Sequence, residues 1–149
     1  MKKFRFSLTT LLQVRREKEN IARKNLLEEH LVLQDHLAKL IVLVRQRQQI
    51  IQSIREKQKE KLAIDELSHH FDYLQTLKKK IDRQFQQINE VHQQLEVLRQ
   101  EVLKAVHQRK IIENLRDKKL TEWETKYLEQ ERAFFDELAT IRFARKQKQ

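Results

Sequence analysis

The chain of 149 residues contains no glycine, no proline and no cysteine. Glycine and proline supply the backbone conformations of tight turns and bulges, so their absence argues against sandwiches, barrels and doubly wound sheets. The lack of cysteine excludes disulfide bonds, thiolate metal sites and a cysteine nucleophile. A chain with so few turn-forming residues is best suited to long helices.

Long apolar runs are missing as well. The longest unbroken run covers residues 40–44, five residues, far below the roughly 20 that a membrane-spanning helix needs. The N-terminus alternates charged and aromatic residues instead of forming the apolar stretch of a secretory signal. We therefore expect a soluble cytoplasmic protein.

Catalytic motifs are also absent, including glycine-rich phosphate loops and the HExxH zinc motif. The one adjacent histidine pair, His69 and His70, lies near Asp65 and Asp72, and we interpret it as part of a solvated turn rather than as a metal site. Carboxylates along a helical rod have no concave pocket in which their pKa values could shift. The sequence therefore predicts no enzyme, no catalytic residue, no cofactor, no metal and no small-molecule substrate.

The net charge of +10 is concentrated at the two ends of the chain. Residues 1–24 carry eight Lys and Arg against two Glu, and residues 140–149 carry four Lys and Arg and no acid. Residues 25–139 hold twenty basic and twenty acidic side chains and are neutral overall. Any electrostatic attraction to a partner is therefore expected at the termini.

Apolar residues recur at the alternating 4-3 spacing of a coiled-coil seam, the line of side chains along which two helices pack. In the first arm the predicted seam comprises Leu33, Leu37, Leu40, Val44, Ile51 and Ile54, with Arg47 as its polar interruption. In the second arm it comprises Leu74, Leu77, Ile81, Phe85, Ile88, Val91, Leu95, Leu98, Val102 and Ala105, with one residue of slip between Ile81 and Phe85. It resumes at Leu120, Trp123, Tyr127, Phe134, Leu138 and Ile141.

The seam is lost around residues 61–70, where Asp65 and Ser68 are suitable N-cap residues for a new helix. The predicted fold is all-α: two long helices forming an antiparallel coiled-coil hairpin, in a single domain over residues 1–149. The helices are expected over about residues 8–62 and 71–145, with a turn over about 63–70 and a basic C-terminal tail. The alternative is one continuous helix that pairs in parallel with a second copy.

Three surfaces remain open to interpretation. The apolar run at residues 40–44 covers more than one turn of helix, so it indicates either a third helix packing there, or oligomerisation, or a specific partner surface.

The basic ends could bind nucleic acid, but Glu17 and Glu19 interrupt the first cluster, and Phe4 and Phe6 lack a stacking platform. Anionic lipid is an accessory possibility for residues 2–24. We expect no nucleic-acid partner.

The chain resembles the FliJ family, stalk proteins of the flagellar type III export apparatus, over nearly its whole length. The resemblance is carried by an N-terminal, a central and a C-terminal segment: Phe4-x-Phe6-x-Leu8-x-x-Leu11-Leu12-x-x-Arg15, Tyr73-Leu74-Gln75-x-Leu77-x-x-x-Ile81, and Asp136-Glu137-x-Ala139-x-x-Arg142. The YscO/InvI stalk proteins of injectisomes are similar in architecture and form the alternative. A generic basic coiled-coil scaffold is a further one.

The resemblance implies a non-enzymatic coupling protein at the inner face of the cell membrane. Its terminal end would enter the hexameric export ATPase, FliI, and another part would contact the export gate protein, FlhA; export chaperones are further implied partners. The implied ATPase-binding residues are Phe4, Phe6, Leu8, Leu11, Leu12, Arg15, Asp136, Glu137, Arg142, Arg145, Lys146 and Lys148. The implied gate-binding residues are Tyr73, Leu77, Lys80 and Gln84, of which Lys80 and Gln84 depart from the family's small residue and histidine.

Overall fold

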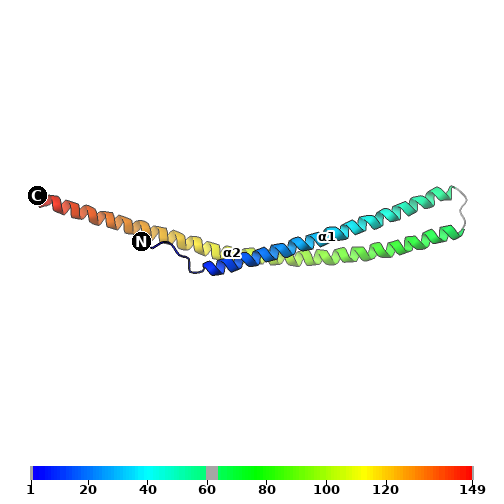
Figure 1. Cartoon of the computed structure of the whole chain (residues 1–149), viewed down its shortest axis with the longest axis horizontal. Helices are drawn as coiled ribbons and strands as arrows, with labels where there is room; N and C mark the ends of the chain where they lie inside the picture. The colour runs from blue at the N-terminus through cyan, green and yellow to red at the C-terminus, as the bar shows by residue number, and fades with distance from the viewer. Residues whose placement is uncertain (1, 60–63, 149) are drawn as a thin grey trace. The chain divides into compact units, whose positions relative to one another are not determined.

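The computed structural model describes residues 2–59 and 64–148, most of which form two long helices (Figure 1). Helix α1 spans Thr9–Gln58 and helix α2 spans Ile64–Gln147, 50 and 84 residues long. The described residues include no strand and no positive-φ residue, so this backbone does not need glycine. The predicted all-α fold of two long helices packed against each other is confirmed.

Helix α2 begins earlier in the chain than the prediction placed it. Of the predicted turn, residue 63 lies outside the described residues, whereas residues 64–70 are helical. Asp65 and Ser68 therefore lie inside α2 and are not its N-cap, and Asp65 with Glu66 forms an acidic first turn. Carboxylates there interact favourably with the positive N-terminal end of the helix dipole, which stabilises the earlier start.

The chain divides into two units, each of which contains part of both helices. Unit 1 comprises Met1–Glu19 and Lys104–Gln149, and unit 2 comprises Asn20–Leu103. In unit 1 the ion pairs Arg16–Glu113 and Glu19–Arg109 join α1 to α2 with residue numbers that run in opposite directions. The two helices are therefore antiparallel in this unit.

The seam of α2 in unit 2 is regular, and the predicted slip after Ile81 is wrong. Gln84 is 7% exposed and occupies the core position between Ile81 and Ile88, whereas Phe85 is 50% exposed. The sequence argument assigned Phe85 to the core because it is apolar, but the alternating 3-4 spacing selects the neighbouring glutamine. The buried series is Leu77, Ile81, Gln84, Ile88, Val91, Leu95, Leu98 and Val102.

The seam of α1 in unit 2 contains more polar residues than predicted. Leu37, a predicted core residue, is exposed, and the half-buried neighbour is His36. One line of half-buried or buried positions follows an unbroken 4-3 spacing: Ala22, Leu26, Glu29, Leu33, His36, Leu40, Leu43, Arg47, Ile50 and Ile54. The half-buried positions beside this line are His30, Val44, Gln46, Ile51 and Ser53, of which Val44 and Ile51 were predicted seam residues. Glu29 and His36 belong to this line, and reasoning from apolar residues alone passes over them.

Candidate functional site

The N-terminal segment of unit 1 packs on α2 through aromatic rings. The Phe4 ring lies 6.1 Å from Trp123 between centroids, and Trp123 stacks on Tyr127 at 5.4 Å with 24° between the ring planes. Phe4, Phe6 and Leu8 line a common groove with Trp123. Phe4 therefore has an aromatic neighbour on α2, in a tilted contact with 55° between the ring planes rather than a stacked one.

The start of α1 is fixed by local hydrogen bonds. The Thr9 hydroxyl donates to the carbonyl of Phe6 at 2.7 Å, and the Leu12 amide donates to the carbonyl of Leu8 at 2.9 Å. Leu12 is buried in the core of unit 1, whereas Leu11 and Arg15 are half-buried. Among the implied ATPase-binding residues, Leu12 therefore stabilises the helix pair and offers almost no surface to a partner.

An ionic cluster joins α1 to α2 in unit 1. Arg109 donates to Glu19 through Nε and to Glu113 through Nη1, the latter at 2.6 Å, and Arg16 donates to Glu113 at 3.3 Å. The hydrogen bond from Arg109, helped by the one from Arg16, lowers the pKa of Glu113 below its ordinary value. Hydrogen bonds to Glu19 and Glu113 raise the pKa of Arg109.

Sequence reasoning missed this cluster. Glu19 is buried although it carries a charge, and Arg109 follows Ala105 by four residues, at a core position of the second arm. The signal available in the sequence was that spacing, together with the i,i+4 pair of Arg109 and Glu113. An acid and a base at core positions of antiparallel helices can fix the register, that is, which residues face each other.

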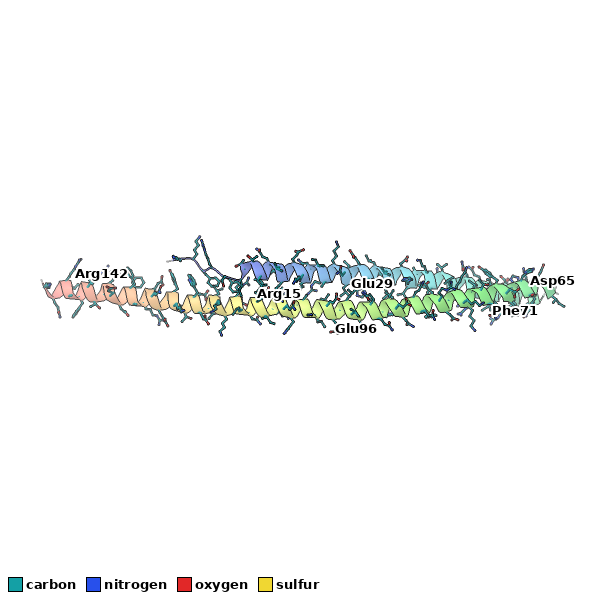
Figure 2. All side chains as sticks on the ribbon, turned by 90° about the horizontal axis from the view of Figure 1, so that it is seen from below. Arg15, Glu29, Asp65, Phe71, Glu96 and Arg142 are labelled. Atoms are coloured by element: carbon teal, nitrogen blue, oxygen red, sulfur yellow. The ribbon has the colours of Figure 1, made fainter. Side chains whose placement is uncertain are left out.

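The last part of α2 in unit 1 is uncovered. Every residue from 132 to 148 is exposed, and the Phe134 and Phe135 rings meet edge to face with centroids 6.0 Å apart. Side chains project from α2 around Arg142 in Figure 2. The exposed large apolar residues here are Phe134, Phe135, Leu138, Ile141 and Phe143. The exposed charged candidates are Asp136, Glu137, Arg142, Arg145, Lys146 and Lys148.

The four implied gate-binding residues of unit 2 do not form one surface. Leu77 is 0% exposed and Gln84 is buried, so both lie between the helices. Tyr73 and Lys80 are exposed. Tyr73 and Leu77 are four residues apart on α2, but Leu77 occupies a core position, so the two side chains do not share an exposed face. Of these four, only Tyr73 and Lys80 can touch a partner without opening the helix pair.

The described residues offer no site for a metal ion or a membrane span. Among them, no group of three or more His, Cys, Asp or Glu side chains could hold a metal. Within the same residues, neither helix is long and apolar enough to cross a membrane. His69 and His70 lie on α2 rather than in a loop.

Comparison with known proteins gives one clear match. The family model described as "Flagellar FliJ protein" matches residues 4–148, which covers nearly the whole chain. Neither the curated proteins nor the solved structures gave a significant match. The matched region contains both helices and both units. The chain therefore belongs to the FliJ family, the non-enzymatic stalk components of the flagellar protein export apparatus.

Proposed function

We propose that this protein couples an export ATPase to an export gate in the flagellar export apparatus. In this proposal the terminal end of unit 1 enters the hexameric ATPase, a FliI-like protein, and the exposed face around Tyr73 in unit 2 contacts a FlhA-like gate protein. The protein then works in the cytoplasm, at the inner face of the membrane, and export chaperones are further partners. Family membership supports the export role, and surface chemistry supports the division of contacts.

The observation that carries the proposal is the uncovered end of α2. Five large apolar side chains, from Phe134 to Phe143, are exposed there together with four Lys and Arg side chains from Arg142 onward. Contiguous apolar surface on a protein commonly marks an interaction site. The basic side chains that follow, unopposed by any acid after Glu137, favour an acidic partner.

The chemistry of this end suits a stalk inside a ring. Long, hydrated lysines and arginines make weak and interchangeable contacts, so they attract the stalk without locking it in one rotational position. The exposed aromatic rings add contact area at low cost in side-chain entropy. A stalk that must be held and yet change its contacts during a catalytic cycle needs both properties.

The test of the ATPase contact replaces Arg142, Arg145, Lys146 and Lys148 by glutamine. We expect weaker binding to the hexameric export ATPase and weaker stimulation of ATP hydrolysis, with the largest loss at low ionic strength, where screening is least. The matched control replaces Lys57, Lys59, Lys78 and Lys79, which are exposed residues of unit 2, by glutamine. It changes the net charge equally but leaves the terminal end intact.

Two outcomes would refute this assignment. Equal losses in both quadruple variants would mean that net charge alone attracts the ATPase. Unchanged binding and stimulation in the Arg142 series would mean that the basic end serves solubility, and the protein would then act as a generic scaffold. Far-ultraviolet circular dichroism verifies that both variants keep their helices.

The gate contact is tested with Tyr73→Ala and Lys80→Ala. Both side chains are exposed, so their removal leaves the helix pair folded and is expected to weaken binding to the gate protein without affecting the ATPase. Phe85→Ala is the control, because Phe85 is an exposed aromatic residue of the same unit. Gate affinity unchanged in the Tyr73 and Lys80 variants would exclude this face.

A further inference from the structure

A groove between α1 and α2 in unit 2 shares one residue, Lys80, with the proposed gate contact, and its other lining residues have no role in the proposed function. Its residues on α1 include Ala38, Val42 and Leu43, which supply apolar surface. Three cationic residues also line it: Lys39 from α1, with Lys80 and Arg83 from α2. The remaining lining residues are Gln46, Gln84 and Gln87. The groove thus combines an apolar floor with a positively charged rim, and no carboxylate lines it.

The apolar floor explains the run at residues 40–44. Leu40, Leu43 and Val44 are half-buried, while Ile41 and Val42 are each 51% exposed. Packing between the two helices therefore accounts for three members of the run. Val42 lines the groove and Ile41 does not, so Val42 is the residue of the run whose exposure a partner in the groove would explain.

The cations on the rim differ in how they are paired. Lys39 forms an exposed i,i+4 ion pair with Asp35 at 3.0 Å. Lys80 and Arg83 have no ion pair with any residue that the structure describes. Their charges are therefore available to carboxylates that a partner brings to the α2 side of the groove.

The side-chain amide nitrogen of Gln84, which also lines the groove, is already hydrogen-bonded within the helix pair. The Gln84 side-chain amide lies 2.9 Å from both the Nδ1 atom and the carbonyl oxygen of His36. A partner that fills the groove therefore does not need to supply a hydrogen-bond acceptor for the Gln84 amide nitrogen. It needs apolar side chains toward α1 and carboxylates toward α2.

We propose that this groove binds an acidic amphipathic helix of a partner protein, as a third helix beside α1 and α2. A helix with leucine-like residues at 4-3 spacing would cover Ala38 and Val42, and glutamates flanking that stripe would reach Lys80 and Arg83. A second copy of this chain is a poor occupant. A two-fold symmetric pairing through the groove would place two copies of a lining with three cations and no carboxylate against each other.

The test uses a designed probe, so it does not depend on the ATPase or the gate. A fluorescein-labelled peptide of about three heptads carries leucine at the two core positions of each heptad and glutamate beside them. Its binding to the full chain is followed by fluorescence anisotropy. Two control peptides keep the composition with the leucines scrambled, or keep the leucines with lysine in place of glutamate. We expect saturable binding of the first peptide alone.

Charge reversal locates the site. The double variant Lys80→Glu with Arg83→Glu is expected to weaken binding about tenfold, since two attractive pairs become repulsive. The matched double variant Lys78→Glu with Lys79→Glu changes the net charge equally at exposed positions that do not line the groove. It is expected to leave the affinity within about twofold. Equal losses in both would reduce the binding to general attraction by a basic protein and overturn the proposal.

The apolar floor offers an even closer control. Val42→Ser is expected to weaken peptide binding about fivefold, because roughly half of a valine side chain is buried by the partner. Ile41→Ser alters a neighbour of equal exposure outside the groove and should have no effect. An equal loss in both variants, or no binding of the glutamate peptide at all, would overturn the proposal. Self-association of the wild type in sedimentation equilibrium, abolished by Val42→Ser, would instead identify a second copy as the occupant.

Discussion

The buried Gln84 on α2 and the half-buried His36 on α1 form a polar contact between the two helices of unit 2. The Nε2 atom of Gln84 lies 2.9 Å from the Nδ1 atom of His36 and donates to the carbonyl oxygen of the same residue at 2.9 Å. Both residues occupy core positions that apolar residues fill in neighbouring layers. A single polar pair in a coiled-coil core fixes which residues face each other, at some expense in stability.

Replacing both members by leucine is expected to keep or raise stability and to reduce specificity. In His36→Leu with Gln84→Leu, two polar groups that had to be desolvated are exchanged for apolar packing, which we expect to change the free energy of unfolding by about 0 to +1 kcal/mol. The loss of the polar layer should permit other registers or oligomers. Urea unfolding and sedimentation equilibrium measure the two effects.

The single variant separates this account from simple packing. His36→Leu alone removes the ring partner of the Gln84 amide, which keeps its hydrogen bond to the backbone carbonyl of residue 36, and should cost about 0.5 to 1.5 kcal/mol. If this single variant proves as stable as the double variant, the hydrogen bond between the two side chains contributes nothing and the account is wrong.

Low pH should reduce the stability of unit 1, because it protonates Glu113. The pKa of Glu113 is lowered in the folded chain, mainly by the Arg109 hydrogen bond, from an ordinary value of 4.5. The charged form of Glu113 therefore contributes fully to stability at a pH above the pKa that Glu113 has in the unfolded chain. This contribution is lost as the pH falls through the lower pKa that Glu113 has in the folded chain. Glu113→Gln should reduce the urea midpoint at neutral pH, and the difference from wild type should shrink below about pH 4.5.

Glu101→Gln is the control for this pH dependence. Glu101 is exposed and forms no ion pair with the residues that the structure describes. Its urea midpoint should follow the wild type at every pH. A difference for Glu113→Gln that stays constant from about pH 7 to about pH 3 would contradict a role for its charged form.

The single tryptophan of the chain reports on the N-terminal segment. Phe4 packs against Trp123, so Phe4→Ala should expose the indole to water and shift its fluorescence emission to longer wavelength. The lost ring contact should cost about 0.5 to 1.5 kcal/mol beyond the buried area. Phe143→Ala removes an exposed ring that lies twenty residues after Trp123 on α2, and it should leave the emission unchanged. Identical spectra for wild type and Phe4→Ala would show that the segment does not rest on Trp123 in solution.

Alanine substitutions at Leu77 and Tyr73 should differ in how much they destabilise the protein, although the resemblance implied that both residues bind the gate. Leu77 is fully buried between the helices, so Leu77→Ala should cost about 2 to 4 kcal/mol through lost transfer energy and a residual cavity. Tyr73 is exposed, and Tyr73→Ala should cost under about 1 kcal/mol. Denaturant unfolding measures both. Similar costs for the two variants would contradict the placement of Leu77 in the core.

The identity of the core residues could be predicted only in part from the sequence. Leu77, Ile81, Ile88, Val91 and Leu95 were correctly assigned, because an apolar residue at 4-3 spacing leaves little choice. Phe85 was misassigned, because hydropathy favours phenylalanine over the adjacent Gln84. The spacing continued through the glutamine, and a contact with His36 from the other helix made that position acceptable for a polar residue.

The amino-acid sequence alone determined that this protein is built from two long helices, because a chain without glycine or proline, with apolar residues at heptad spacing, has few other ways to bury them. It also determined the family, through segments distributed along nearly the whole chain. The tertiary structure decided which polar residues enter the core, since burial of Glu19 depends on Arg109, ninety residues away in the chain. The same packing decided which candidates remain exposed, because the rotation of each helix follows from all of its contacts and not from any single residue.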